Sequence, residues 1–207
     1  MSLSVRHEAE DPAPDLNALI GSRICHDLIS PLGAIGNGVE LLTLSGFDSS
    51  PEVALIAQSV ESANARIRYF RVAFGAAGRE QSLGGAEIAT ILDAISQTGK
   101  HRITWPSDGA VPRPIAKLGF LVILCLESAM PWGGRIAVTR TSDRWRIDGQ
   151  ADRMRIETVH WDILADPDAT SRVTSSDVEF PLAALAAQSL GRALVTERAE
   201  GWIAVTF

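Results

Sequence analysis

A histidine followed by a carboxylate is the feature of this sequence that most clearly suggests chemistry. His26 and Asp27 follow Cys25, and Ser30 and Pro31 come about one helical turn later. Neighbouring residues of a helix point about 100° apart, so Cys25 and His26 cannot meet as a thiolate and its base. A neutral imidazole is itself a nucleophile, and an unperturbed imidazole has a pKa of about 6.5. His26 is therefore a candidate nucleophile in its own right.

The segment around His26 has the spacing of a long amphipathic helix, from about residue 16 to residue 44. Apolar residues recur every three or four positions, at Leu16, Ile20, Ile24, Leu28, Leu32, Ile35, Val39 and Leu42. We expect Pro31 to bend this helix. The opposite face is polar and carries His26 together with Ser22, Arg23, Asp27, Ser30, Asn37 and Glu40.

A second helix is expected after a short turn. Ser50 and Pro51 are typical of a helix start. A heptad spacing then runs through Val53, Ile56, Val60, Ala63, Ile67, Phe70 and Phe74. The short connection predicts an antiparallel hairpin, which leaves part of each apolar seam uncovered. We expect a second copy to cover it in a homodimeric four-helix bundle; the alternative is that the hairpin packs on the chain's own C-terminal half.

The rest of the chain is typical of a mixed helical and stranded domain. Helices are expected at 86–95, 115–130 and 182–190, and strands at 103–105, 135–140, 144–148, 194–198 and 202–207. Helices among antiparallel strands predict a two-layer α/β sandwich. The expected fold class is thus α+β, with a disordered leader at 1–15, a helical hairpin domain at 16–78 and an α/β domain at 79–207.

Composition and charge exclude several classes of protein. The net charge of −6 gives no basic surface for nucleic acid. The longest apolar run, residues 120–126, is too short for a bilayer, and the acidic N-terminus does not fit a signal peptide. Two cysteines without a CxxC pair argue against a disulfide framework or a zinc site, and neither lysine belongs to a Walker A loop. We therefore expect a cytoplasmic protein.

The stretch from His26 to Leu32 resembles the H-box of sensor histidine kinases, in which a histidine is followed by an acidic residue, a small polar residue and proline. In that family the motif lies on the first helix of a dimeric hairpin. The wider string from Arg23 to Leu42, together with residues 71–76 at the end of the second helix, is similar to the ChpT-type histidine phosphotransferases.

The C-terminal half resembles the ATP-binding domain of those kinases without its chemistry. Ser128 stands where the kinases carry a metal-binding asparagine. Asp148-Gly149 retains only part of the adenine-binding loop, and residues 181–185 lack the glycines of the phosphate loop. Losing all three elements predicts a degenerate domain that binds no cofactor and serves as a docking surface.

The resemblance implies a histidine phosphotransferase of a bacterial two-component phosphorelay. His26 would accept a phosphoryl group from the receiver-domain aspartate of a hybrid histidine kinase and pass it to a response regulator. The receiver domain would bring Mg²⁺ and a lysine. Asp27 would orient the imidazole ring; alternatively it is a carboxylate of the helix surface. Ser30 occupies the position of a residue that assists dephosphorylation in related kinases; alternatively it is a serine that bends the helix beside Pro31. Arg23 and Asn37, on the outer face, are candidate phosphate or partner contacts.

Two arginines of the second helix are further candidates. If the hairpin turns near residues 47–48, His26 lies opposite Tyr69, with Arg66 and Arg71 within about a turn. Their guanidinium groups could bind phosphate oxygens or acidic residues around a receiver active site. Equally, they could form ion pairs, for instance with Glu61 or Glu40.

Two other functions remain open from the sequence. One is an ATP-dependent histidine kinase with divergent nucleotide motifs, which ATP binding would reveal. The other is a non-catalytic dimeric adaptor, which acid-labile phosphate on His26 would exclude.

Overall fold

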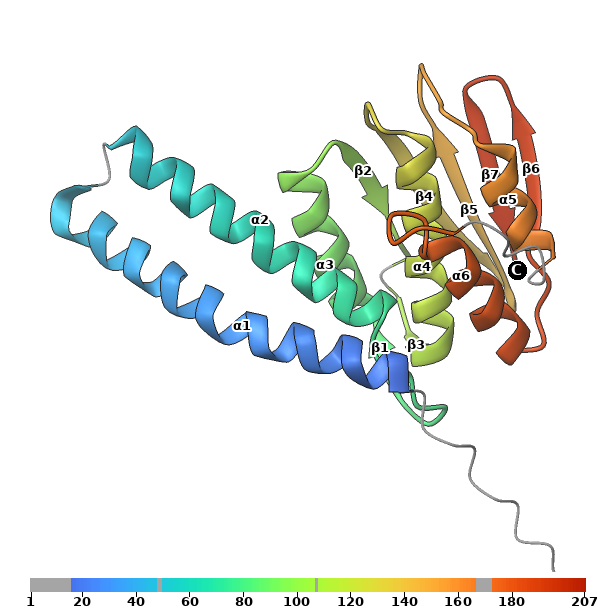
Figure 1. Cartoon of the computed structure of the whole chain (residues 1–207), viewed down its shortest axis with the longest axis horizontal. Helices are drawn as coiled ribbons and strands as arrows, with labels where there is room; N and C mark the ends of the chain where they lie inside the picture. The colour runs from blue at the N-terminus through green and yellow to red at the C-terminus, as the bar shows by residue number, and fades with distance from the viewer. Residues whose placement is uncertain (1–15, 48–49, 107, 167–172) are drawn as a thin grey trace, which may run out of the picture.

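The computed structural model describes residues 16–47, 50–106, 108–166 and 173–207. The expected leader, residues 1–15, lies outside this part of the chain. Figure 1 shows a long helical hairpin whose second helix packs along a mixed body of helices and strands.

The hairpin forms as its spacing predicts. Helix α1 (Leu16–Leu42) contains Pro31 and continues into a π-helical turn, η1 (Thr43–Phe47). Helix α2 (Pro51–Ala73) begins where the Ser50 hydroxyl accepts a hydrogen bond from the Val53 amide at 3.4 Å. The two helices run antiparallel, with Gly21 beside Phe74 and Gly36 beside Val60.

The apolar face of α1 is divided between two environments. Ala18, Cys25 and Val39 are buried. Ile24, Leu28, Ile35 and Leu42 remain about half exposed in the single chain. The structure thus shows an uncovered apolar stripe along α1, with Leu28, Ile35 and Leu42 at heptad spacing.

Helix α2 also packs on the chain's own body. Ala65, Tyr69, Val72 and Ala73 belong to the main hydrophobic core, and the Tyr69 hydroxyl donates to the Phe120 carbonyl at 3.1 Å. The heptad pattern did not predict this contact surface, because most of these residues lie off the apolar seam. The alternative of packing on the C-terminal half therefore holds for this face of α2.

The body contains two sheets and four helices in the part of the chain that the structure describes. Its elements are β1 (Ser82–Gly84), α3 (Gly85–Thr98), β2 (His101–Thr104), β3 (Ala110–Pro112), α4 (Arg113–Ala129), β4 (Gly134–Thr141), β5 (Arg144–Gln150), α5 (Thr158–Ala165), α6 (Glu179–Ser189), β6 (Val195–Ala199) and β7 (Trp202–Thr206).

A five-stranded sheet, in the order β2-β4-β5-β7-β6, forms the larger layer. Strands β2 and β4 are parallel and the other pairs antiparallel. Along β4 and β5, buried residues such as Ile136, Val138 and Ile147 alternate with exposed or half-exposed ones. The helices cover the buried face (Figure 1), so the body has the two layers expected.

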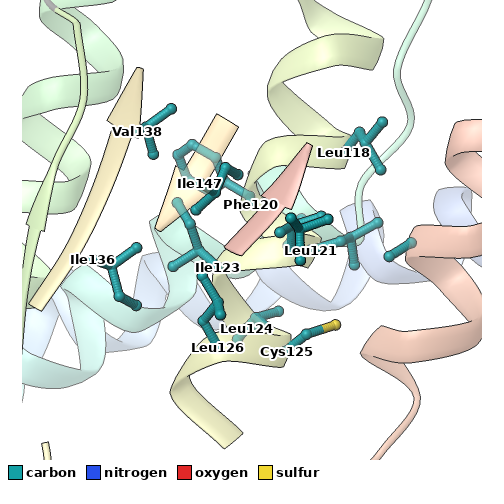
Figure 2. Close-up of a cluster of buried hydrophobic side chains, with 14 of the residues drawn as sticks. Leu118, Phe120, Leu121, Ile123, Leu124, Cys125, Leu126, Ile136, Val138 and Ile147 are labelled. Atoms are coloured by element: carbon teal, nitrogen blue, oxygen red, sulfur yellow. The ribbon is translucent and has the colours of Figure 1, made fainter. Parts of the chain in front are cut away.

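Helix α4 lies at the centre of the core. Nearly all of its residues from Ile115 to Ala129 are buried, because it packs on α2, α6 and the sheet. Figure 2 shows Phe120 and Ile123 of α4 facing Ile136, Val138 and Ile147 of the strands. A helix that is apolar on all sides is typical of such a position.

Most predicted elements of the body are confirmed, with small shifts at their ends. The closing hairpin turns at Gly201, which has φ of +66°. Strands β1 and β3 and helix α5 were not predicted. The strands have three residues each, too few for a periodic signal, and α5 has only eight.

The first helix gives a different result from the longest apolar run, which we judged too short to cross a membrane. Taken as a whole helix, Asn17–Ser45 is long and apolar enough to span a bilayer by length and composition alone. The same helix exposes the charged side chains of Arg23, Asp27 and Glu40.

Candidate functional site

His26 lies on the exposed polar face of α1, as its spacing predicts. Its side chain is 85% exposed. At about 100° per residue, it points about a quarter turn to one side of the face that contacts α2, and the uncovered apolar stripe points to the other side. A bulky partner could therefore approach the imidazole without displacing any helix or strand that the structure describes.

Asp27 holds the imidazole from one side. The carboxylate oxygen Oδ1 lies 3.1 Å from His26 Nδ1, and Oδ2 accepts a hydrogen bond from Arg23 Nε at 2.7 Å. The hydrogen bond with His26, followed by that from Arg23, lowers the pKa of Asp27, so this carboxyl stays ionised. An ionised acceptor favours the proton on Nδ1 and leaves the Nε2 lone pair free toward solvent.

Ser30 and Asn37 share this face and are exposed. Ser30 makes no side-chain hydrogen bond among the described residues, whereas Ser45 and Ser59 donate to the carbonyl four residues earlier. The Ser30 hydroxyl is thus available on the turn that follows His26.

The candidate arginines occupy different environments. Arg23 is bound to Asp27. Arg66 pairs with Glu127 of α4 at 3.0 Å and stacks on the Tyr69 and Phe70 rings. The sequence left open whether Arg66 binds phosphate or forms an ion pair. In the structure Arg66 forms an ion pair, but its partner is Glu127 rather than Glu61 or Glu40. Contact between Arg66 and phosphate stays a prediction.

Arg71 is exposed and belongs to the last turn of α2. Burial raises the pKa of the Cys25 thiol, and the positive charge of Arg71 partly offsets this rise. The positive charge of Arg71 is therefore close to the residue that directly precedes His26.

Glu127 is a residue that the sequence analysis missed. Its side chain is only 8% exposed, and His101 Nδ1 lies 3.8 Å from Oε1 in addition to the Arg66 contact. A single carboxylate in the largely apolar helix expected at 115–130 was a usable signal, because a buried charge needs a partner.

The positions that correspond to nucleotide motifs have other contacts here. Asp148 pairs with Arg146 at 3.1 Å on the open face of the sheet. Gly149 packs so closely on Leu126 and Met130 that a Cβ would lie 3.1 and 3.2 Å from their side chains. Residues 181–185 lie within α6, and Ser128 is half-buried near the end of α4. Among the described residues, no group of three His, Cys, Asp or Glu side chains could hold a metal ion.

Comparisons with known proteins find a matching family and a similar curated protein. The family described as "Histidine phosphotransferase C-terminal domain" matches residues 85–201. "Protein phosphotransferase ChpT" of Brucella abortus (strain 2308) is 42% identical over 134 residues, which cover 61% of this chain and 61% of that protein. The match therefore spans less than two thirds of that curated relative.

One solved structure resembles this chain over nearly its whole length. A structure described as a bacterial phosphotransferase has a TM-score of 0.66 and 26% identity, and the match covers 96% of this chain and 98% of that one. A histidine kinase domain from the blue-light-activated kinase EL346 of Erythrobacter litoralis has a TM-score of 0.44 and 16% identity, over 93% of each chain.

Proposed function

Because the chain belongs to the histidine phosphotransferase family, we propose that it is a cytoplasmic phosphorelay intermediate in which His26 carries the phosphoryl group. The donor is the phosphorylated receiver-domain aspartate of a hybrid histidine kinase, and the acceptor is the receiver domain of a response regulator. The exposed imidazole, held at Nδ1 by Asp27, is the observation that carries this proposal.

The transfer uses the free lone pair of His26. Nε2 attacks the phosphorus of the donor's aspartyl phosphate, an N–P bond forms, and the aspartate carboxylate leaves with the electron pair of the P–O bond. Asp27 holds the ring and stabilises the positive charge that develops on it. Mg²⁺ held by the partner receiver domain would neutralise phosphate charge. In the second step the acceptor's aspartate attacks and His26 leaves.

Labelling tests this proposal directly. A receiver domain loaded with radiolabelled acetyl phosphate should transfer label to the chain, and the label should be lost in acid but stable in base. His26→Gln should abolish it. An unlabelled wild-type chain with every receiver domain of the source organism would contradict the proposal.

The stripe of Ile24, Leu28, Ile35 and Leu42 supports a homodimer. Burying a large apolar side chain completely contributes roughly 2 kcal/mol, so four half-exposed residues are a substantial driving force. Heptad spacing suits another helix, and a second copy of the hairpin offers the same stripe across a two-fold axis. We propose that two chains form a four-helix bundle, with both His26 side chains facing outward.

The body at 79–207 is proposed to be a degenerate kinase ATPase domain that docks partners. The ion pair of Asp148 and the packing of Gly149 support this, because neither residue is free to receive a nucleotide base. Millimolar Mg-ATP should therefore leave the melting temperature unchanged and produce no phosphohistidine; either effect would favour an autokinase instead.

A further inference from the structure

The end of α2 nearest His26 brings together two guanidinium groups from distant parts of the sequence. Arg71 belongs to the last turn of α2, and Arg113 is the first residue of α4. Arg113 Nη2 donates a hydrogen bond to the Arg71 carbonyl at 2.7 Å. Packing of α2 on α4 therefore adds a cation from the body to the end of the hairpin.

The two positive charges are not neutralised within the described part of the chain. Neither Arg71 nor Arg113 forms an ion pair there, whereas Arg23 is bound to Asp27 and Arg66 to Glu127. Burial lowers the pKa of Arg113, the charge of Arg71 lowers it further, and Glu87 opposes the change only in part. Two adjacent like charges are unfavourable unless an anion joins them.

The register of the hairpin places Arg71 beside His26, and Arg113 contacts the backbone of Arg71. Gly21 lies beside Phe74, and the Ala76 amide donates to the Ser22 hydroxyl at 3.1 Å. Five residues along α1, His26 is therefore level with about Tyr69, and Arg71 lies within one turn.

The helical angles place Arg71 on the same side of the hairpin as His26. The angle meant here is the direction in which a side chain points about its helix axis, measured from the line that joins the two helices. In a pair of antiparallel helices, a positive angle on either helix points to the same side of this line. Measured from that line at about 100° per residue, His26 lies about 90° and Arg71 about 40° in this direction. Arg66 lies about 100° in the opposite direction, on the side of the uncovered stripe.

We propose that Arg71 and Arg113 form a docking site for the acidic surface around the phosphorylated aspartate of a partner receiver domain. This inference rests on the proposed function and extends it: the body supplies a contact to the phosphotransfer face of the hairpin. Guanidinium groups bind carboxylates with two parallel hydrogen bonds, so the pair selects partners by the position of their carboxylates.

The test measures single-turnover transfer from a receiver domain loaded with radiolabelled acetyl phosphate, over a range of receiver concentrations. Arg113→Gln and Arg71→Gln should each raise the half-saturating concentration about tenfold, the effect of losing one charge-assisted hydrogen bond. The rate at saturation should change less than twofold. Arg113→Lys should recover part of the affinity, because it keeps the charge.

Two controls separate docking from folding and chemistry. Arg102→Gln is matched, because Arg102 also donates to a backbone carbonyl, that of Ser96 at 2.9 Å, and is exposed elsewhere; it should leave the half-saturating concentration unchanged. Direct labelling of His26 by phosphoramidate, which needs no receiver domain, should be the same in all these variants.

The outcomes are distinguishable. Transfer to the wild type with unchanged half-saturation in both glutamine variants would overturn the docking site and leave the proposed function intact. Reduced phosphoramidate labelling in Arg113→Gln would also overturn it, since the residue would then act on folding or on His26 itself. A wild type that accepts no label from any receiver domain would overturn the proposed function and the docking site together.

Discussion

At the scale of the residue, the chemistry of this protein depends on the tautomer of one imidazole. His26 is exposed, and among the described residues one polar side chain, Asp27, lies within hydrogen-bonding distance, at 3.1 Å. Because Arg23 donates to the other oxygen of the same carboxylate, Asp27 is held in place from two sides. The three residues are consecutive or one turn apart, so the local helix alone determines their contacts.

Replacing Asp27 tests this arrangement. Asp27→Asn should slow transfer at saturating donor by about ten- to a hundredfold, because an amide can present its NH₂ group and favour the unreactive tautomer. Arg23→Gln, which keeps the carboxylate, should have a smaller effect. Single-turnover labelling of His26 measures both, and equal rates in Asp27→Asn and the wild type would show that Asp27 is only a surface carboxylate.

Glu179 should make stability depend on pH. Burial raises the pKa of this carboxyl at the start of α6 above that of an unfolded glutamate, about 4.3. Between the two pKa values the folded chain keeps a proton that the unfolded chain releases, so stability falls as the pH rises through this range. Glu179→Gln should therefore melt at a higher temperature than the wild type at pH 7 and at the same temperature near pH 3.5.

Glu197 provides a control of opposite sign. Its hydrogen bond from Arg146 lowers its pKa, so its contribution to stability is present at neutral pH and lost as the pH falls through the lowered value. Glu197→Gln should be slightly less stable than the wild type at pH 7, by a small amount because the pair is exposed. A melting temperature of Glu179→Gln below that of the wild type at pH 7 would contradict the effect of burial.

At the scale of the element, α1 and α2 each present two different apolar surfaces. In α1, one surface packs on α2 and the other is the uncovered stripe. In α2, one surface packs on α1 and another belongs to the core of the body. A charge at Ile67 would disturb the chain itself, because this residue is buried within it, whereas the stripe can be changed without affecting the intrachain core.

A charge in the stripe should separate the dimer without unfolding the chain. Leu28→Glu or Ile35→Glu should convert a dimer into a helical monomer, since both side chains are already half exposed in the single chain. Asn37→Glu, on the polar face, should remain dimeric. Sedimentation equilibrium and circular dichroism measure these outcomes, and a monomeric wild type would exclude the bundle.

At the scale of the whole molecule, a partly buried ion pair joins the hairpin to the body. Arg66 of α2 and Glu127 of α4 are separated by 61 residues in sequence. The Tyr69 hydroxyl bond to Phe120 and the Arg113 bond to the Arg71 carbonyl lie on the same interface. Contacts along this length of α2 make the hairpin and the body one folded unit.

Removing the Arg66 cation should show how much free energy is lost when the Glu127 carboxylate stays buried without it. Arg66→Met should lower the free energy of unfolding by about 2–3 kcal/mol, because Glu127 would remain buried without its cation. This corresponds to roughly 4–12 °C in melting temperature for a chain of this size. The double variant Arg66→Met, Glu127→Gln should recover part of the loss. Additive losses in the two single variants and the double variant would show that the pair is not coupled.

The sequence by itself determined the features that depend on local spacing. The two helices of the hairpin, the exposed position of His26 and the hairpin of β6 and β7 follow from periodicity, a serine cap and a glycine turn. These are properties of neighbouring residues, and they hold wherever the segment is placed in the fold.

Only the tertiary structure decided which surfaces meet. A helical wheel shows that α2 has an apolar seam, but not that Tyr69 on another face enters a core built around α4. It does not show that Arg66 turns to Glu127, or that Arg113 reaches the last turn of α2. These contacts join residues 42 to 61 positions apart. They arise because burying apolar area between elements, which is non-directional, brings distant polar groups together.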